Sequence, residues 1–199
     1  MTDTLPRFPE LNEAALSARQ REVYDAIVSG PRGDVVGPLR VWLQSPELAA
    51  RAQALGQYVR FDSALTPAQS ELAILVTARI WSSDFEWSHH APIAAKAGVS
   101  ADVIEAIANA RRPNLDNDVS RAVFDVAVEI HRDRAVSDDT FARARSVLGE
   151  SALVDLIGIC GYYAFISMTI NAFHVPPDGP TLPKLGLPAG DMFRDPPAA

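Results

Sequence analysis

The sequence contains a single cysteine, Cys160, among its 199 residues. One thiol excludes an intramolecular disulfide, a CxxC redox pair and a thiolate-rich zinc site. The HExxH signature is also absent, so four histidines are the remaining ligands for a soft metal ion. We therefore expect no metal site.

The chain also lacks an excess of positive charge. Its formal net charge is -7, with 18 Lys and Arg against 25 Asp and Glu. General nucleic-acid binding needs a basic surface that neutralises phosphates, and this composition offers none. Small molecules or other proteins are the expected partners.

Targeting and membrane signals are weak as well. The N-terminal stretch "MTDTLPRFPELNEAAL" has neither a basic n-region nor a long apolar run, so a cytoplasmic location is expected. The uncharged run Leu156–Phe173 has the minimum length of a membrane span. Because Gly, Ser, Thr and Asn residues interrupt it and no basic flank follows, it favours a helix buried in the core or at a subunit interface.

No segment shows the alternating pattern of a strand, so the predicted fold class is all-α. Helical periodicity and cap residues predict helices within residues 12–30, 45–61, 65–81, 83–97, 100–110, 118–134, 137–149 and 151–173, with a loop at 31–39. We divide the chain into an N-terminal helical extension (1–36), a central domain (37–174) and a Pro/Gly-rich C-terminal arm (175–199) that is extended or disordered.

The helix that starts after Thr66 has the strongest signals. Thr66 is the expected N-cap, and Gln69 completes a capping box. From Leu72 to Ala78 the sequence is apolar on every side of the helix, which predicts a central place in the core. Glu71 lies at the edge of this apolar run, where it is either solvated near the helix N-terminus or buried and a candidate proton donor.

The segment "SSDFEWSHHAP" concentrates polar side chains in the next helix. Glu86 completes a Ser83-x-x-Glu86 capping box, but it also lies one turn before His90, on the same face. His90 points inward on this periodicity, next to a carboxylate. The pair is therefore either a structural hydrogen bond with a cap, or an acid-base pair.

Two neighbours of this pair have different roles on the same helix. His89 lies about 100° further round and is expected to be more exposed. Pro92 removes a backbone hydrogen bond inside the helix, which predicts a kink or a widened pocket next to His90.

Three stretches together, "GPLRVWLQSPELAARAQALGQYVRF", "SELAILVTARIWSSDFEWSHHAPIAAKAGVS" and "GYYAFISMTINAF", resemble the carboxymuconolactone decarboxylase family and its AhpD-like relatives. The resemblance implies an all-helical domain that assembles into homotrimers or homohexamers. In the peroxidase branch the motif is a glutamate, a CxxC pair and a histidine. Glu71 and His90 match the glutamate and the histidine, whereas Ser83 and Glu86 occupy the two cysteine positions.

The missing thiols exclude the disulfide chemistry of the peroxidase branch. The decarboxylase branch needs no cofactor, and its substrates are carboxylated unsaturated lactones. The resemblance therefore implies a lyase-type or isomerase-type enzyme in which His90, oriented by Glu86, delivers a proton and Glu71 assists. The expected substrate-binding residues are Ser83, Trp87, His89, Arg79, Tyr163 and Asn171.

Two other interpretations remain open on the sequence. One is a peroxidase-like antioxidant enzyme that uses Cys160. The other is a non-catalytic oligomeric protein that binds a small molecule, in which the Glu86 to His90 segment only caps and packs a helix.

Overall fold

The computed structural model describes residues 5–9 and 11–194. Residues 1–4 and 10 of the predicted extension and residues 195–199 of the predicted arm lie outside it. All regular structure in the described ranges is helical. The first half contains η1 (Glu13–Ala15), α1 (Ala18–Ser29), α2 (Pro38–Trp42), α3 (Pro46–Gln57), η2 (Tyr58–Asp62) and α4 (Pro67–Ile80). The second half contains α5 (Asp84–Lys96), α6 (Ala101–Ala108), α7 (Asp118–Arg132), α8 (Asp138–Phe173) and η3 (Ala189–Asp191). The prediction of an all-α fold is confirmed.

Helix α4 is the centre of the bundle. It contacts α5, α6, α7 and α8, and every residue from Ser70 to Ile80 is buried. Its start is fixed as predicted, since the Thr66 side chain accepts from the Gln69 amide and the Gln69 side chain accepts from the Thr66 amide. An uninterrupted apolar surface on α4 requires neighbours on all sides, which the other helices supply.

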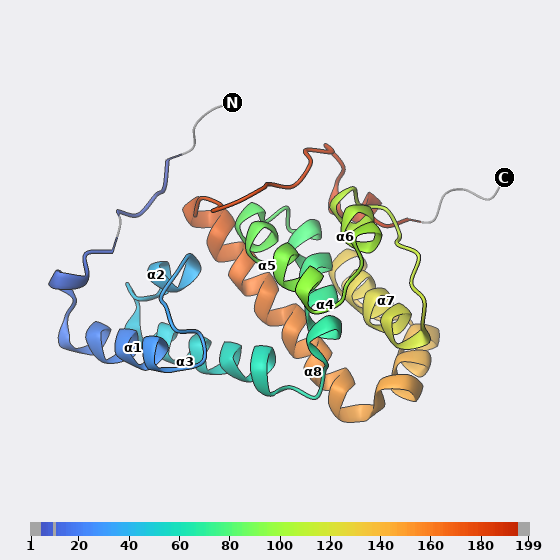
Figure 1. The fold of residues 1–199 in the computed structure, drawn as a ribbon, viewed down its shortest axis with the longest axis horizontal. Coiled ribbons are helices and arrows are strands. Elements are labelled where there is room, and N and C mark those ends of the chain that lie inside the picture. The colour runs from blue at the N-terminus through green and yellow to red at the C-terminus, as the bar shows by residue number, and fades with distance from the viewer. Residues whose placement is uncertain (1–4, 10, 195–199) are drawn as a thin grey trace.

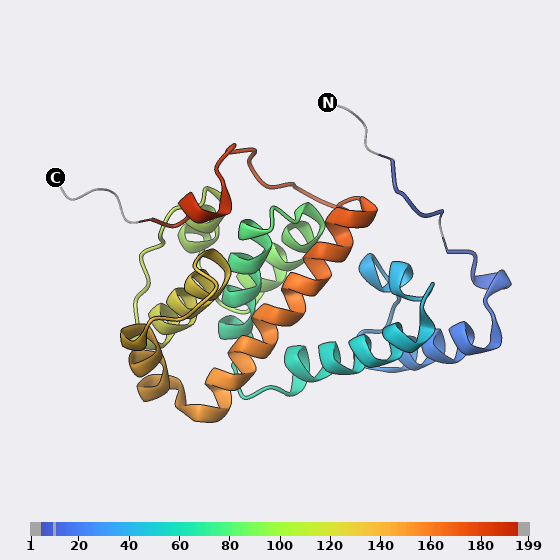
Figure 2. The same cartoon turned by 180° about the vertical axis from the view of Figure 1, so that it is seen from behind.

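Helices α1 to α3 lie beside this bundle rather than around α4, as Figures 1 and 2 show from opposite sides. Helix α2 joins the two parts by packing on α8. The sequence analysis assigned residues 31–39 to a loop and predicted no helix before residue 45, so it missed this five-residue helix. Gly37 with a φ of 52° and Pro38 at the first helical position set its beginning.

The end of α3 also differs from the prediction. The chain continues directly into η2, which is one turn of π-helix. Such turns insert a residue into a helix and are frequent at functional sites. This turn contains Arg60, which reappears at the candidate site.

The predicted helices 137–149 and 151–173 are joined in α8. Gly149 has a φ of 77° and a ψ of 175°, which kinks the helix at that residue. By length and composition α8 could cross a membrane, but 67% of its most apolar window is buried inside the protein. A core helix passes the same test.

The described part of the C-terminal arm runs without regular structure apart from η3 and packs on its own chain. Leu182, Met192 and Phe193 are buried, and the Phe193 amide donates to the Ala110 carbonyl. Phe193 also meets the Phe124 ring edge-to-face, with centroids 5.4 Å apart. The arm therefore covers the α6 and α7 side of the bundle.

We expect Phe193→Ala to lower the free energy of unfolding by about 3–5 kcal/mol, because it empties a buried aromatic site. Leu187→Ala is the matched control, since Leu187 lies in the same arm and is 45% exposed. That control should stay within about 0.5 kcal/mol of the parent. Denaturant unfolding measures both, and equal effects would show that the arm does not stabilise the bundle.

Candidate functional site

The candidate site is built on α4 and α5, around His90. Glu71 is the second residue of the buried stretch of α4, and its side chain is 6% exposed. The His90 ring lies on α5 and is 2% exposed. His90 Nδ1 and Glu71 Oε2 are 2.8 Å apart, so a short buried hydrogen bond ties the two helices together.

Glu86 approaches the other side of the ring. Its Oε2 lies 3.4 Å from His90 Nε2, one helical turn away on α5, and its side chain is 4% exposed. This oxygen makes no hydrogen bond to the described residues. His90 therefore lies between two buried carboxyl groups, and only the one from Glu71 is hydrogen-bonded to it.

One arrangement of protons suits this asymmetry. If Nδ1 of His90 donates to the Glu71 oxygen, the unprotonated Nε2 faces Glu86. Burial raises the pKa of Glu86, although His90 and more distant arginines oppose the shift. A neutral Glu86 holds a proton next to a nitrogen that accepts one.

Two aromatic groups frame the His90 ring. Tyr163 meets it edge-on at a centroid distance of 5.0 Å, and His89 does so at 5.1 Å. Burial lowers the pKa of His89 to about 4, so this ring is neutral at neutral pH. His89 is only half-buried and stacks on Phe85, with the ring planes 7° apart.

A small pocket of about 40 Å³, hereafter the His90 pocket, opens next to these groups. It lies where the extension meets the bundle. Its lining consists of Arg32, Val36, Pro38, Leu39, Arg60, Phe85, Glu86, His89, His90, Tyr162, Tyr163 and Ile166.

Comparison with known proteins identifies a family over part of the chain. Residues 46–129 match the model of the Carboxymuconolactone decarboxylase family. The family resemblance seen in the sequence is therefore confirmed for this segment, hereafter the family segment. The family segment contains Glu71, Glu86 and His90, whereas Arg32 and Tyr163 lie outside it. The His90 pocket thus combines family and non-family parts of the chain.

Solved structures show the same fold over most of the chain. An uncharacterized peroxidase-related protein from Silicibacter sp. TM1040 is 15% identical, with a TM-score of 0.70 over 96% of this chain and 100% of its own. The debrominase Bmp8 is also 15% identical, with a TM-score of 0.62 over 85% of this chain and 90% of its own. At this identity the likeness concerns the AhpD-like fold alone. No curated protein matches the sequence.

Within the family segment, the capping-box interpretation of Glu86 is wrong. Ser83 is the N-cap of α5, but its side chain makes no capping hydrogen bond and its buried Oγ has no partner among the described residues. Glu86 instead turns inward to His90. Because Phe85, Glu86 and Trp87 are buried, the Glu86 side chain lies in the core instead of reaching back to the Ser83 amide as a capping box requires.

Four of the predicted substrate-binding residues do not line the His90 pocket: Ser83, Trp87, Arg79 and Asn171. Trp87 is buried in the core, and the Asn171 side chain donates to the Trp81 carbonyl. Arg79 donates to the Ala108 and Pro183 carbonyls and to Ser82, so it fastens the C-terminal arm. His89 and Tyr163, by contrast, do line the His90 pocket, as expected.

The sequence analysis missed two arginines that do line the pocket, Arg32 and Arg60. Arg32 lies in the loop after α1, and Arg60 lies in the π-helical turn η2. A periodicity of 3.6 residues does not describe a π-turn, and loop contacts have no periodic signal. Neither arginine was therefore recognisable from spacing.

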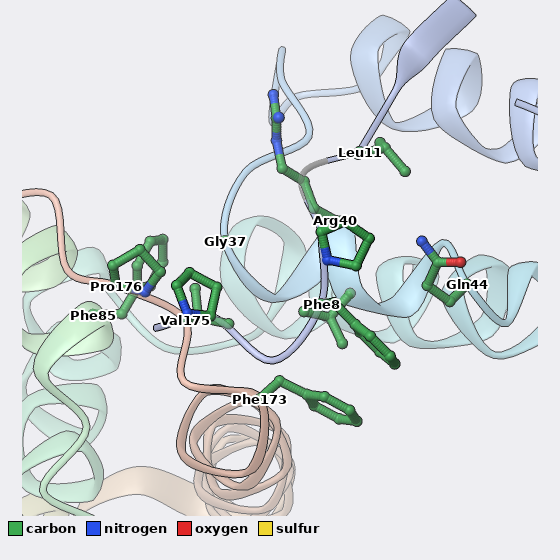
Figure 3. Close-up of a pocket in the computed structure, with 12 residues that line it drawn as sticks. Phe8, Leu11, Gly37, Arg40, Gln44, Phe85, Phe173, Val175 and Pro176 are labelled. Atoms are coloured by element: carbon green, nitrogen blue, oxygen red, sulfur yellow. The ribbon is translucent and has the colours of Figure 1, made fainter. Parts of the chain in front are cut away.

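An apolar groove of about 240 Å³, larger than the His90 pocket, lies next to it, and Phe85 lines both. Figure 3 shows Phe8 next to Phe173, with Phe85 and Pro176 across the groove. The Phe8 and Phe173 rings stack at 4.7 Å, and Arg7 donates to the Phe173 and Ala172 carbonyls. Among the described residues, Arg40 is the one ionisable residue in this lining, whereas Glu86 and His90 line the smaller pocket.

Cys160 lies apart from the His90 pocket. It is buried in α8, and burial raises the pKa of its thiol to about 12. A nucleophilic or redox-active cysteine needs the thiolate form. The position of Cys160 therefore disfavours the thiol-dependent interpretation. Within the described residues, no cluster of three His, Cys, Asp or Glu side chains is suited to a metal ion.

We expect Glu86→Gln to raise the melting temperature, and to do so more at pH 8 than at pH 5. Because the folded pKa of Glu86 lies above the unfolded value of about 4.3, its contribution to stability is full below that value and is lost as pH rises through the folded pKa. Each kcal/mol regained corresponds to about 2–4 °C. Glu150→Gln, on an exposed side chain, is the control. A gain that is the same at every pH would contradict a buried neutral Glu86.

Proposed function

We propose that this protein is a cofactor-independent enzyme that moves a proton on a small carboxylated or lactone-type substrate. The observation that supports this is His90, held by Glu71 and facing Glu86 in a pocket that both His90 and Glu86 line. A histidine and a carboxyl group within reach of a substrate form a general acid-base pair. A purely structural contact would not require a second buried carboxyl group without a hydrogen bond.

The proposed roles are distinct for the three side chains. Glu86 and His90 line the pocket and act as the catalytic acid-base pair. Glu71 is absent from the lining, so it is a positioning residue that fixes the tautomer and orientation of His90. This division changes the sequence-based assignment, in which Glu86 oriented His90.

A decarboxylation fits these roles. As the bond to the carboxylate breaks, its electron pair moves into the conjugated carbonyl system of a lactone, and carbon dioxide leaves. A proton then passes to carbon from Glu86 or from protonated His90, and it is recovered from water. An isomerisation uses the same groups, since one takes a proton from carbon and the other returns it.

His90→Gln should reduce kcat by about 10²-fold to 10⁴-fold on any substrate found in a panel of lactones and ring-cleavage acids, because it removes the proton-transfer group. Carbon dioxide release and NMR of the products measure turnover. Glu150→Gln is the control on an exposed carboxylate. Undiminished turnover by a folded His90→Gln protein would contradict the proposal.

Glu71→Gln separates positioning from structure. It should lower kcat less than His90→Gln and shift the pH profile of kcat, because the amide holds the ring without the negative charge. A merely structural Glu71 would change the melting temperature and leave that profile unchanged.

Self-association to a homotrimer or homohexamer is part of the same proposal. Val154, Ile157 and Met168 are 70%, 39% and 48% exposed and share one face of α8. Such an apolar stripe is typical of a protein interface. Light scattering after gel filtration should give a trimer or hexamer mass that falls in Val154→Lys; a monomeric parent protein would contradict this part.

A further inference from the structure

The His90 pocket contains more positive charge than its own residues neutralise. Arg32 makes one hydrogen bond, from Nη2 to the Tyr162 hydroxyl at 3.2 Å, and its buried Nε has no partner among the described residues. Arg60 has a cation-π contact with Phe61 and no ion pair within the described part of the chain. Two guanidinium groups therefore line the pocket without a carboxylate bound to either.

Glu86 does not supply the missing negative charge. It is the one acidic residue that the described part of the chain places in the lining, and burial favours its neutral form. Its Oε2 makes no hydrogen bond to either arginine. Arginines that line a recess without a counter-ion are costly to the folded state unless a ligand satisfies them.

Local structure holds these donors in place. A Cβ on Gly56 would lie 2.0 Å from the Tyr162 hydroxyl oxygen and 2.4 Å from Arg32 Nη2, so both groups occupy the space that glycine leaves. The Tyr162 hydroxyl accepts from Arg32, and its own hydrogen has no acceptor in the described ranges. Burial raises the pKa of Tyr162 to about 12, so this hydrogen stays in place at neutral pH.

We propose that Arg32, Arg60 and the Tyr162 hydroxyl form an anion site that binds a carboxylate of the substrate next to Glu86 and His90. The planar fork of a guanidinium matches a carboxylate, and a volume of about 40 Å³ has room for a group of that size. This inference rests on the proposed function only in that the bound carboxylate belongs to a substrate. The anion site itself is independent of turnover.

The experiment is a titration of the full-length protein with benzoate at low ionic strength, in a buffer free of carboxylates, followed by calorimetry. Benzamide is the neutral analogue, acetate the minimal carboxylate, and inorganic phosphate tests for a phosphate site. We expect benzoate and acetate to bind, benzamide not to bind, and added salt to weaken binding.

Arg60→Gln and Arg32→Gln should each weaken benzoate binding about tenfold or more, which is about 1.4 kcal/mol. Tyr162→Phe should weaken it less. Arg51→Gln is the matched control, because Arg51 is an exposed arginine on α3 that pairs with Glu47. If Arg32→Gln fails to fold, Arg60→Gln and the charge-retaining Arg60→Lys carry the test, with Arg60→Lys intermediate.

His90→Gln separates this inference from the proposed function. It should retain benzoate binding while losing turnover, so an inactive parent protein that still binds benzoate through Arg60 would contradict only the enzymatic proposal. No binding of benzoate or acetate, equal binding of benzamide, binding of phosphate alone, or unchanged affinity in both arginine variants would overturn the anion site.

Discussion

The hydrogen bond between His90 Nδ1 and Glu71 Oε2 determines how the two central helices meet. It joins α5 to the most buried helix of the protein over 2.8 Å, with both side chains almost fully removed from solvent. A buried polar contact of this kind is tolerated only when its donors and acceptors are matched. It also sets the direction in which the second nitrogen of His90 faces, and hence the side on which the proposed proton transfer would occur.

The pocket next to His90 is assembled from residues inside and outside the segment that matches the family model. The family segment supplies Glu86, His90 and Arg60, and residues before and after it supply Arg32, Tyr162 and Tyr163. The proposed acid-base pair and most of the walls around it therefore come from different parts of the chain. Function then depends on the walls as much as on the centre.

How far the sequence predicts this site depends on the kind of signal. Local signals were sufficient for α4, where the Thr66 cap and the apolar run are written within one segment, and for placing His90 and Glu86 on one face of α5. They failed for the Ser83 and Glu86 capping box, because burial against α4 is a tertiary effect that overrides local spacing. They also failed for Arg79, whose carbonyl partners lie in α6 and the C-terminal arm.

The π-helical turn η2 makes the charge of this pocket sensitive to the length of the chain. A π-turn contains one residue more than the α-helical turn it replaces, so its loss would let α3 continue as a regular α-helix. Each residue of an α-helix advances the side chains by about 100°. Deletion of a single residue from Tyr58–Asp62 would therefore rotate the Arg60 position away from its present side while leaving the α4 and α5 pair intact. A change of one residue in the length of this turn would therefore alter the charge of the pocket without any substitution of Arg60 itself.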